Sequence, residues 1–263
     1  MNFRMCVVLG IVVVCAGFHS PLGAEVQAGQ QDVDMNAPAP RLSNGKPDFS
    51  GVWGRPYVPD ITRSFTNENG TSNVGEADLP FTDWGQQEWD NYDPAANGDY
   101  AGSCMPFGWL RSFSPHPMQI LQNNDHIAFL FEQSTMFALV PTDGREHRGW
   151  GPTWFGDSVG RWDGDTLVIE AVNFNGWAKL DTSGHPFSPD ATLTMMFRRL
   201  DMGHVEFDWI LDDPTTYTSP ISNQRVFVLT PDIEVMEYAC MEGNLDLLIE
   251  GVISPWRPPA PGN

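Results

Sequence analysis

The sequence predicts an all-β fold, a single antiparallel up-and-down β-barrel with a long irregular insertion after its first strand. In the second half of the chain, short β-rich segments alternate with tight turn signals. Apolar residues at helical spacing are nearly absent there. Strands joined in order by tight turns form a meander, which we expect to close on itself. The stretch before this half is irregular and rich in Trp, Asp and Asn, which predicts the insertion.

The first 24 residues have the pattern of a secretory signal peptide. Arg4 precedes an apolar run over 5–18 that is too short to span a bilayer, and Ala24 marks a plausible cleavage point. Lipid attachment at Cys15 is disfavoured, because Val14 before it is not the small residue that such processing needs. We therefore expect a secreted or periplasmic protein with no stable membrane anchor after cleavage.

The remaining chain divides by composition. Residues 25–45 are polar and small and predict a flexible leader, followed by the barrel domain over 46–250 and a C-terminal tail over 251–263. The insertion is expected at about 59–115. Within it, Thr82 is a possible helix cap before the acidic residues of a short helix that ends near Trp89.

The barrel strands are expected on either side of turn signals. The signals are Asn123-Asn124-Asp125, Pro141-Thr142-Asp143-Gly144, Asp163-Gly164-Asp165, Asp201-Met202-Gly203 and Pro231-Asp232. The expected strands are Met118–Leu121, His126–Phe131, Thr135–Val140, Ser158–Trp162, Thr166–Val172, Thr192–Leu200, His204–Leu211, Gln224–Thr230 and Glu234–Cys240. The pair Asp163 and Asp165 resembles the start of a calcium loop but lacks the required Gly and Glu, so we interpret it as a turn.

The expected first strand carries a motif. Residues 49–53 read FSGVW, which resembles the F-x-G-x-W form of the first strand in lipocalin-like (calycin) barrels. That resemblance implies that Trp53 closes one end of the barrel beneath an arginine from a late strand. Arg225 is the first candidate for this arginine and Arg198 the second.

Three stretches resemble a group of secreted bacterial proteins of uncharacterised activity. They are residues 45–53 (GKPDFSGVW), 152–168 (PTWFGDSVGRWDGDTLV) and 212–218 (DDPTTYT). Many members of the group carry His where this chain has Asp157. The resemblance implies export but no particular chemistry.

Cleavage of the signal peptide would leave two cysteines, Cys104 and Cys240. In an exported protein two distant cysteines most simply form a disulfide. A shared metal is the alternative, but neither cysteine has a neighbouring His or Cys at ligand spacing. We therefore expect the disulfide.

Charge limits the possible partners. The formal net charge is −20, and only two of the 14 cationic residues are lysines, Lys46 and Lys179. Binding along a phosphate backbone needs clustered Lys and Arg, so nucleic acid is excluded as a partner, and docking on an anionic membrane is disfavoured.

Catalytic candidates are few, since the chain has no phosphate loop, dinucleotide fingerprint, G-x-S-x-G or H-E-x-x-H. His185 lies between Gly and Pro in a long loop after Asp181, where a histidine can serve as a general base. Asp181 or Asp157 would orient its imidazole. His126, on an expected strand, is a further candidate if it faces the barrel interior. Structural roles remain open for all four residues.

Aromatic residues crowd the same loops and predict a mouth that binds a small, mostly apolar ligand. The candidate ligand-binding residues are Trp150, Trp154, Phe155, Trp177, Phe187 and Arg161. Packing in the core and rim is the alternative for the rings, and stacking on a sugar is a further one.

A metal site would need His126, His147 and His185 to converge with Glu132 or Asp157. No two of these residues have a close metal-ligand spacing, so no metal or other cofactor is expected. The sequence thus predicts a secreted lipocalin-like barrel that binds a small apolar or aromatic molecule. The alternative is a secreted lyase, isomerase or hydrolase that uses His/Asp acid–base chemistry in the barrel mouth.

Overall fold

The computed structural model describes residues 33–97, 99–251 and 255–256. The expected signal peptide, the first part of the leader and the end of the tail lie outside these residues. Within them, no helix has both the length and the apolar character needed to cross a bilayer.

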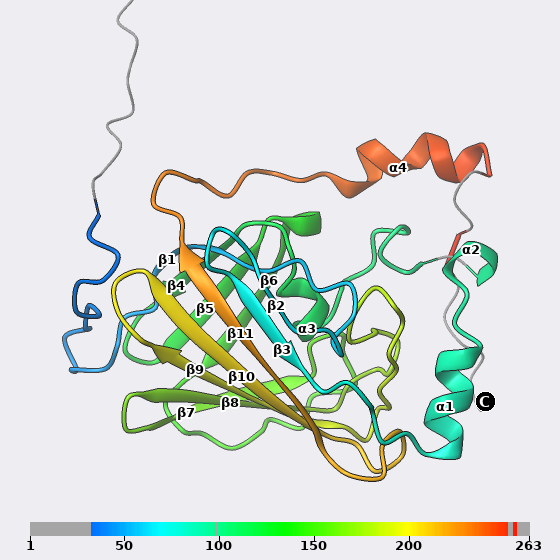
Figure 1. The fold of residues 1–263 in the computed structure, drawn as a ribbon, viewed down its shortest axis with the longest axis horizontal. Coiled ribbons are helices and arrows are strands. Elements are labelled where there is room, and N and C mark those ends of the chain that lie inside the picture. The colour runs from blue at the N-terminus through cyan, green and yellow to red at the C-terminus, as the bar shows by residue number, and fades with distance from the viewer. Residues whose placement is uncertain (1–32, 98, 252–254, 257–263) are drawn as a thin grey trace, which may run out of the picture. The chain divides into compact units, whose positions relative to one another are not determined.

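The described strands form one antiparallel sheet (Figure 1). Nine of them follow the order β6-β5-β4-β1-β11-β10-β9-β8-β7. Their bounds are β1 Gly51–Gly54, β4 Met118–Gln122, β5 His126–Phe131, β6 Met136–Pro141, β7 Asp157–Asp163, β8 Thr166–Val172, β9 Thr192–Arg199, β10 His204–Asp212 and β11 Ile221–Leu229. At the two ends of this path, the Gly144 N–H donates to the Gly160 carbonyl at 3.2 Å. The sheet is therefore nearly closed, and the predicted all-β barrel is confirmed.

The insertion between β1 and β4 is more structured than its composition indicates. It holds a hairpin, β2 Phe65–Thr66 and β3 Ser72–Gly75, and three helices, α1 Asp83–Asp90, α2 Pro94–Asn97 and α3 Trp109–Ser112. Strand β3 pairs with β11. The Thr82 hydroxyl accepts the Gly85 N–H at 3.0 Å, which confirms the predicted cap of α1.

Aromatic side chains fill the barrel interior. Phe113, directly after α3, is fully buried at the centre of a group of rings. Its ring lies 4.8 to 6.0 Å from those of Phe129, Phe197, Phe207 and Phe227, which come from β5, β9, β10 and β11. The insertion therefore supplies a ring to space that a ligand-binding barrel of this type would leave open.

Trp53 has a different arginine partner from the two predicted. The guanidinium of Arg199 lies 4.8 Å from the Trp53 ring centre. Arg198, next along β9, points outward and pairs with Asp208 at 3.1 Å. Alternation along β9 explains this difference, because neighbouring residues of a strand face opposite sides of the sheet.

Arg225 is also buried, but it serves the insertion. Its guanidinium donates to the carbonyls of Leu110 and Phe113 at 2.9 and 3.2 Å and to Asn73 Oδ1 at 3.2 Å. Arg225 therefore holds α3 and β3 against β11.

The predicted disulfide between Cys104 and Cys240 is confirmed. It joins the insertion to helix α4, Cys240–Ile249, and is compatible with an extracellular or periplasmic location. The predicted strand Glu234–Cys240 is wrong, because residues 233–239 form no strand. Strand β11 has β10 along one edge and β1 and β3 along the other, so no free edge remains for the next segment.

A short 3₁₀ helix, η1 Gln133–Thr135, joins β5 to β6.

The described part of the leader is anchored to hairpin turns of the barrel. The carbonyls of Met35 and Ala37 each accept an N–H of the β9–β10 turn at 2.8 Å. Arg41 forms an ion pair with Asp165 at 2.6 Å.

Candidate functional site

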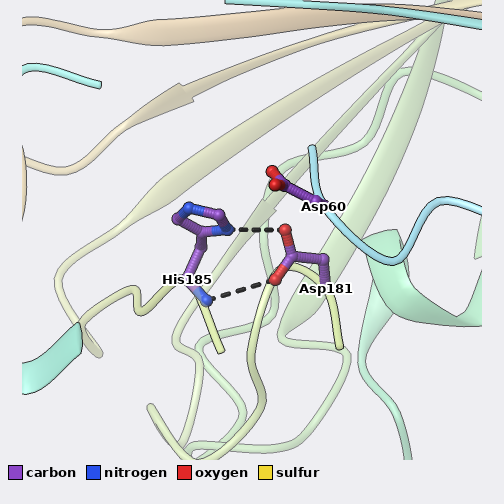
Figure 2. Close-up of side chains that lie close together, drawn as sticks. All are labelled: Asp60, Asp181 and His185. Atoms are coloured by element: carbon purple, nitrogen blue, oxygen red, sulfur yellow. Dashed lines mark hydrogen bonds and ion pairs between the residues drawn. The ribbon is translucent and has the colours of Figure 1, made fainter. Parts of the chain in front are cut away.

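Asp181 and His185 form a buried pair in the loop between β8 and β9 (Figure 2). His185 Nδ1 lies 2.6 Å from Asp181 Oδ2, and the His185 backbone N–H donates to Oδ1 at 3.2 Å. The separation of four residues lets one turn of the loop make both contacts. The interaction predicted between these two residues is therefore present.

Asp60 approaches the pair from the insertion. One ligand atom from each of Asp60, Asp181 and His185 lies within 4.8 Å of the others. Partial burial alone would raise the pKa of Asp60. Hydrogen bonds from the Thr62 hydroxyl and N–H, and then the charges of His185 and Arg63, lower that pKa below its usual value.

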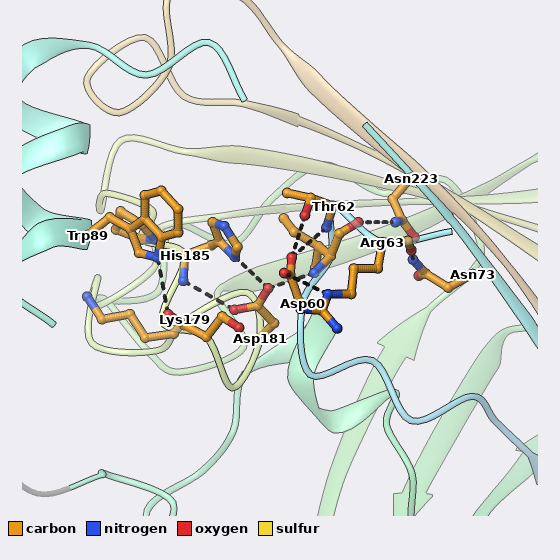
Figure 3. A network of polar contacts seen from close by, with 12 residues as sticks. Asp60, Thr62, Arg63, Asn73, Trp89, Lys179, Asp181, His185 and Asn223 are labelled. Atoms are coloured by element: carbon orange, nitrogen blue, oxygen red, sulfur yellow. Dashed lines mark hydrogen bonds and ion pairs between the residues drawn. The ribbon is translucent and has the colours of Figure 1, made fainter. Parts of the chain in front are cut away.

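The imidazole lies beneath aromatic rings. The Trp89 ring of α1 is 4.8 Å from the His185 ring and nearly parallel to it, and Phe81 lies at 6.3 Å. Trp89 Nε1 donates to the Ser183 carbonyl at 3.2 Å, which fixes α1 over the loop (Figure 3). His185 is 1% exposed.

These contacts suit proton transfer better than metal binding. Asp181 holds Nδ1, and among the described residues Nε2 has no hydrogen-bond partner, the arrangement of an oriented general base. Asp, Asp and His are residue types that hold divalent cations. Asp181, however, already accepts three N–H groups, two from His185 and one from Ile61 at 2.7 Å. Both carboxylate oxygens of Asp181 thus already have partners, which leaves Asp181 less capacity to bind a metal ion.

The Ile61 contact also gives the pair a structural role. It fixes the insertion to the β8–β9 loop, and Asn223 of β11 donates to the Ile61 carbonyl at 3.0 Å (Figure 3).

A second site lies where the barrel is not fully closed. A cavity of about 370 Å³ lies between β6 and the segment that leads into β7. We call it the seam cleft. Its apolar lining is Trp109, Phe137, Ala138, Leu139, Val140, Pro141, Trp150 and Phe155. The Trp109 indole is buried and donates to the Phe155 carbonyl at 2.7 Å, which holds the 150–156 loop against the barrel.

Five polar residues also line the seam cleft: His126, Arg148, Thr153, Asp157 and Ser158. Asp157 is buried, and its Oδ2 accepts the Gly149 N–H at 2.8 Å. Its other carboxylate oxygen has no hydrogen-bond partner among the described residues, so it can accept a donor from a ligand. Arg148 lies over the exposed Trp150 ring at 4.6 Å.

The structure divides the predicted site residues between separate places. Asp157, His126, Trp150 and Phe155 line the seam cleft, whereas Asp181 and His185 lie beneath α1. Asp157 is therefore placed with the cleft and is not the carboxylate that orients His185.

The other predicted ligand residues lie outside the seam cleft. Trp154 and Trp177 pack against each other and against Trp256, with ring centres 5.7 Å apart. Phe187 is buried beside Phe174 at 5.2 Å. Arg161 lies exposed on β7.

Sequence reasoning missed several residues of both sites. Asp60 and Trp89 belong to the insertion, and nothing local in the sequence connects them to His185. Phe137 and Leu139 are exposed, and their alternation along one predicted strand is the signal that could have placed them on an outward face.

The histidines do not form the metal group that was considered. In the described part of the chain, the group of converging ligand atoms contains His185 but neither His126 nor His147. His147 Nε2 instead lies 3.0 Å from Glu170.

No known protein family matches the chain, and no curated protein is significantly similar to it.

Proposed function

We propose that this is an exported barrel protein that binds a small, largely apolar molecule in the seam cleft. The observation that carries the proposal is the cleft itself, with about 370 Å³ of space, aromatic walls and one buried carboxylate. Ligand sites of proteins commonly have this size and are lined mainly by apolar and aromatic side chains with a few polar groups.

The lining also defines a ligand class. The rings of Trp150 and Phe155 suit a flat apolar or aromatic body. Asp157 can only accept hydrogen bonds when ionised, so a ligand with a hydroxyl or amine N–H donor is favoured over a carboxylic acid. Burial strengthens such a bond because water does not compete for it.

Binding can be tested with N-phenyl-1-naphthylamine, a neutral fluorescent probe with one N–H donor. We expect saturable fluorescence enhancement in the wild type and at least a fivefold weaker Kd in Trp150→Ala. Trp84→Ala is the matched control, because Trp84 is an exposed tryptophan on α1. Equal Kd values for all three proteins, or no saturable binding, would refute the proposal.

Export is part of the proposal. The signal-like first 24 residues and the Cys104–Cys240 disulfide support an oxidising compartment outside the cytoplasm. Intact mass of the protein from its native host should show loss of about 24 residues. A full-length mass in a cytoplasmic fraction would contradict it.

A second candidate is an acid–base enzyme centred on His185. The observation in its favour is the Asp181–His185 contact of 2.6 Å with Nε2 left unbonded. Because His185 is buried, substrate would reach it only after covering side chains move, and Trp89, stacked on the imidazole, is one of these. In this case His185→Ala abolishes turnover in a substrate screen and leaves the probe's Kd in the seam cleft unchanged. A substrate turned over equally by both proteins would exclude His185.

A further inference from the structure

Two buried arginines meet at the C-terminal end of α3. Arg55 follows β1 and Arg225 lies on β11, and their side chains are 5% and 0% exposed. Arg225 Nη1 donates to the carbonyls of Leu110 and Phe113, and Arg55 Nη1 donates to the carbonyl of Ser112. These carbonyls belong to one helical turn, so the two guanidiniums approach the same point from β1 and β11.

Three donors of these guanidiniums remain unused. Arg55 Nε and Nη2 and Arg225 Nη2 are buried and have no hydrogen-bond partner among the described residues. Buried donors without partners are rare in native proteins, because their lost hydration is not replaced. Arg55 and Arg225 bond to carbonyls of the same turn and act on each other electrostatically, so these unused donors belong to one region of the interior.

The two positive charges also lack a paired carboxylate. Neither arginine forms an ion pair in the part of the chain that the structure describes. Glu132 is the carboxylate that acts on Arg55, but its Oε2 accepts the Met236 N–H. Asp181 acts on Arg225, but it holds His185 and Ile61.

The electrostatic consequence is the same for both residues. Burial, followed by the charge of Arg225, lowers the pKa of Arg55 to about 9. Burial lowers the pKa of Arg225 to about 10. His116 is the other titratable group near Arg55, and burial and then Arg55 lower its pKa, which favours its neutral form. Two like charges thus lie buried with only partial compensation from Glu132 and Asp181.

We propose that Arg55 and Arg225 hold a small buried anion, a halide or a short carboxylate, at the end of α3. Such an ion would accept hydrogen bonds from the three unused nitrogens and neutralise one of the two charges. It must be small, because the Phe131 ring lies 5.8 Å from the Arg55 guanidinium and the fully buried Phe113 follows α3. Neither arginine lines the seam cleft, so this site is independent of the proposed ligand.

The direct test is a crystal of the disulfide-bonded protein grown in sodium bromide. We expect an anomalous peak in contact with Arg55 Nη2 and Arg225 Nη2. A second crystal in sodium formate distinguishes the two anion types by the shape of the density. Water alone at this position in both crystals overturns the proposal.

A test in solution uses the coupling between anion binding and folding, since an ion that binds only the folded protein stabilises it. Chloride replaces gluconate at constant ionic strength while the unfolding equilibrium is measured in urea. Above its Kd, each tenfold rise in chloride should favour folding about tenfold in the wild type. Arg145→Met should respond equally, because Arg145 is an exposed arginine paired with Asp143. Arg55→Met should not respond.

If Arg55→Met does not fold, Arg55→Lys replaces it. Lysine keeps the charge but lacks the planar fork of donors, so its response to chloride should be several-fold weaker. A wild-type response equal to that of the Arg55 variant, or no response at all, contradicts the proposal.

Discussion

The interior of the barrel and the seam between β6 and β7 use aromatic rings in opposite ways. Inside, Phe113 packs on the rings of β5, β9, β10 and β11, with ring centres 4.8 to 6.0 Å apart. At the seam, Trp150 and Phe155 line a cavity that stays open. The seam cleft therefore lies in the wall of the barrel and not among the rings of its interior.

The cause is the way the sheet ends. Strands β6 and β7 approach each other closely at Gly160, where an added Cβ would lie 3.1 Å from the Pro141 carbonyl. Beyond this point the 145–156 loop replaces strand pairing. Side chains of that loop, rather than backbone hydrogen bonds, close the wall.

Removing the central ring should have the largest effect. Phe113→Ala should lower the free energy of unfolding by about 3–5 kcal/mol, because it leaves a cavity among packed rings. Urea unfolding measures this loss. Titration of the same variant with the fluorescent probe shows whether the new cavity binds it. A rise in stoichiometry from one probe molecule to two would show that the interior differs from the seam cleft only because side chains fill it. A loss below about 1 kcal/mol would show that the interior is not closely packed.

Removal of the disulfide should lower the stability of the fold but leave ligand binding in the seam cleft unchanged. Cys104→Ser with Cys240→Ser should cost about 4–5 kcal/mol, because the closed loop is long. The probe's Kd should change less than twofold, since neither cysteine lines the seam cleft. Loss of probe binding in a variant that is still folded would contradict the separation of the two regions.

A larger side chain in the seam cleft should close it, as aromatic rings close the interior of the barrel. Ala138 lines the seam cleft on β6, and Ala138→Leu should weaken probe binding about tenfold by occupying part of the space, which corresponds to about 1.4 kcal/mol. Ala128→Leu makes the same change at a half-buried position on β5 that does not line the cleft, and serves as the control. Fluorescence titration compares the two. Equal affinities would place the probe elsewhere.

The smallest effect is expected at Asp60. Its folded-state pKa is lowered, so ionised Asp60 adds stability above its unfolded pKa, and this stability is lost as pH falls through the folded pKa. Asp60→Asn should therefore flatten the acid side of the stability profile slightly, because the carboxylate keeps some contact with solvent, which screens its interactions. Thermal unfolding from pH 2 to 6 measures it. An unchanged profile would show that Thr62 and His185 do not stabilise the ionised Asp60 side chain in the folded protein.

Local pattern predicted most of the barrel. The turn Asp163-Gly164-Asp165 placed β7 and β8 to within one residue, because two-residue hairpin turns fix register. The hairpin of β2 and β3 was not expected, since its residues are polar. It is held by β11, where Arg225 Nε donates to Asn73 at 3.2 Å.

The two candidate sites were only partly predictable, because sequence pattern reports local contacts but not contacts between distant segments. Asp181 and His185 lie four residues apart, so their contact is local and was expected. Asp60 and Trp89 reach His185 through the path of the insertion, which no sequence pattern reports. Strand face separates the outward Arg198 from Arg199, which lies over Trp53, whereas Arg225 also faces the interior but is bonded to the insertion.

The central claim is that the seam cleft carries a small organic ligand, and native mass spectrometry of the protein isolated from its own compartment tests it most directly. The account predicts a discrete adduct of a few hundred daltons in the wild type that is lost in Ala138→Leu and kept in Ala128→Leu. An adduct of equal occupancy in both variants, or a clean apoprotein that also fails to bind the naphthylamine probe, would contradict it.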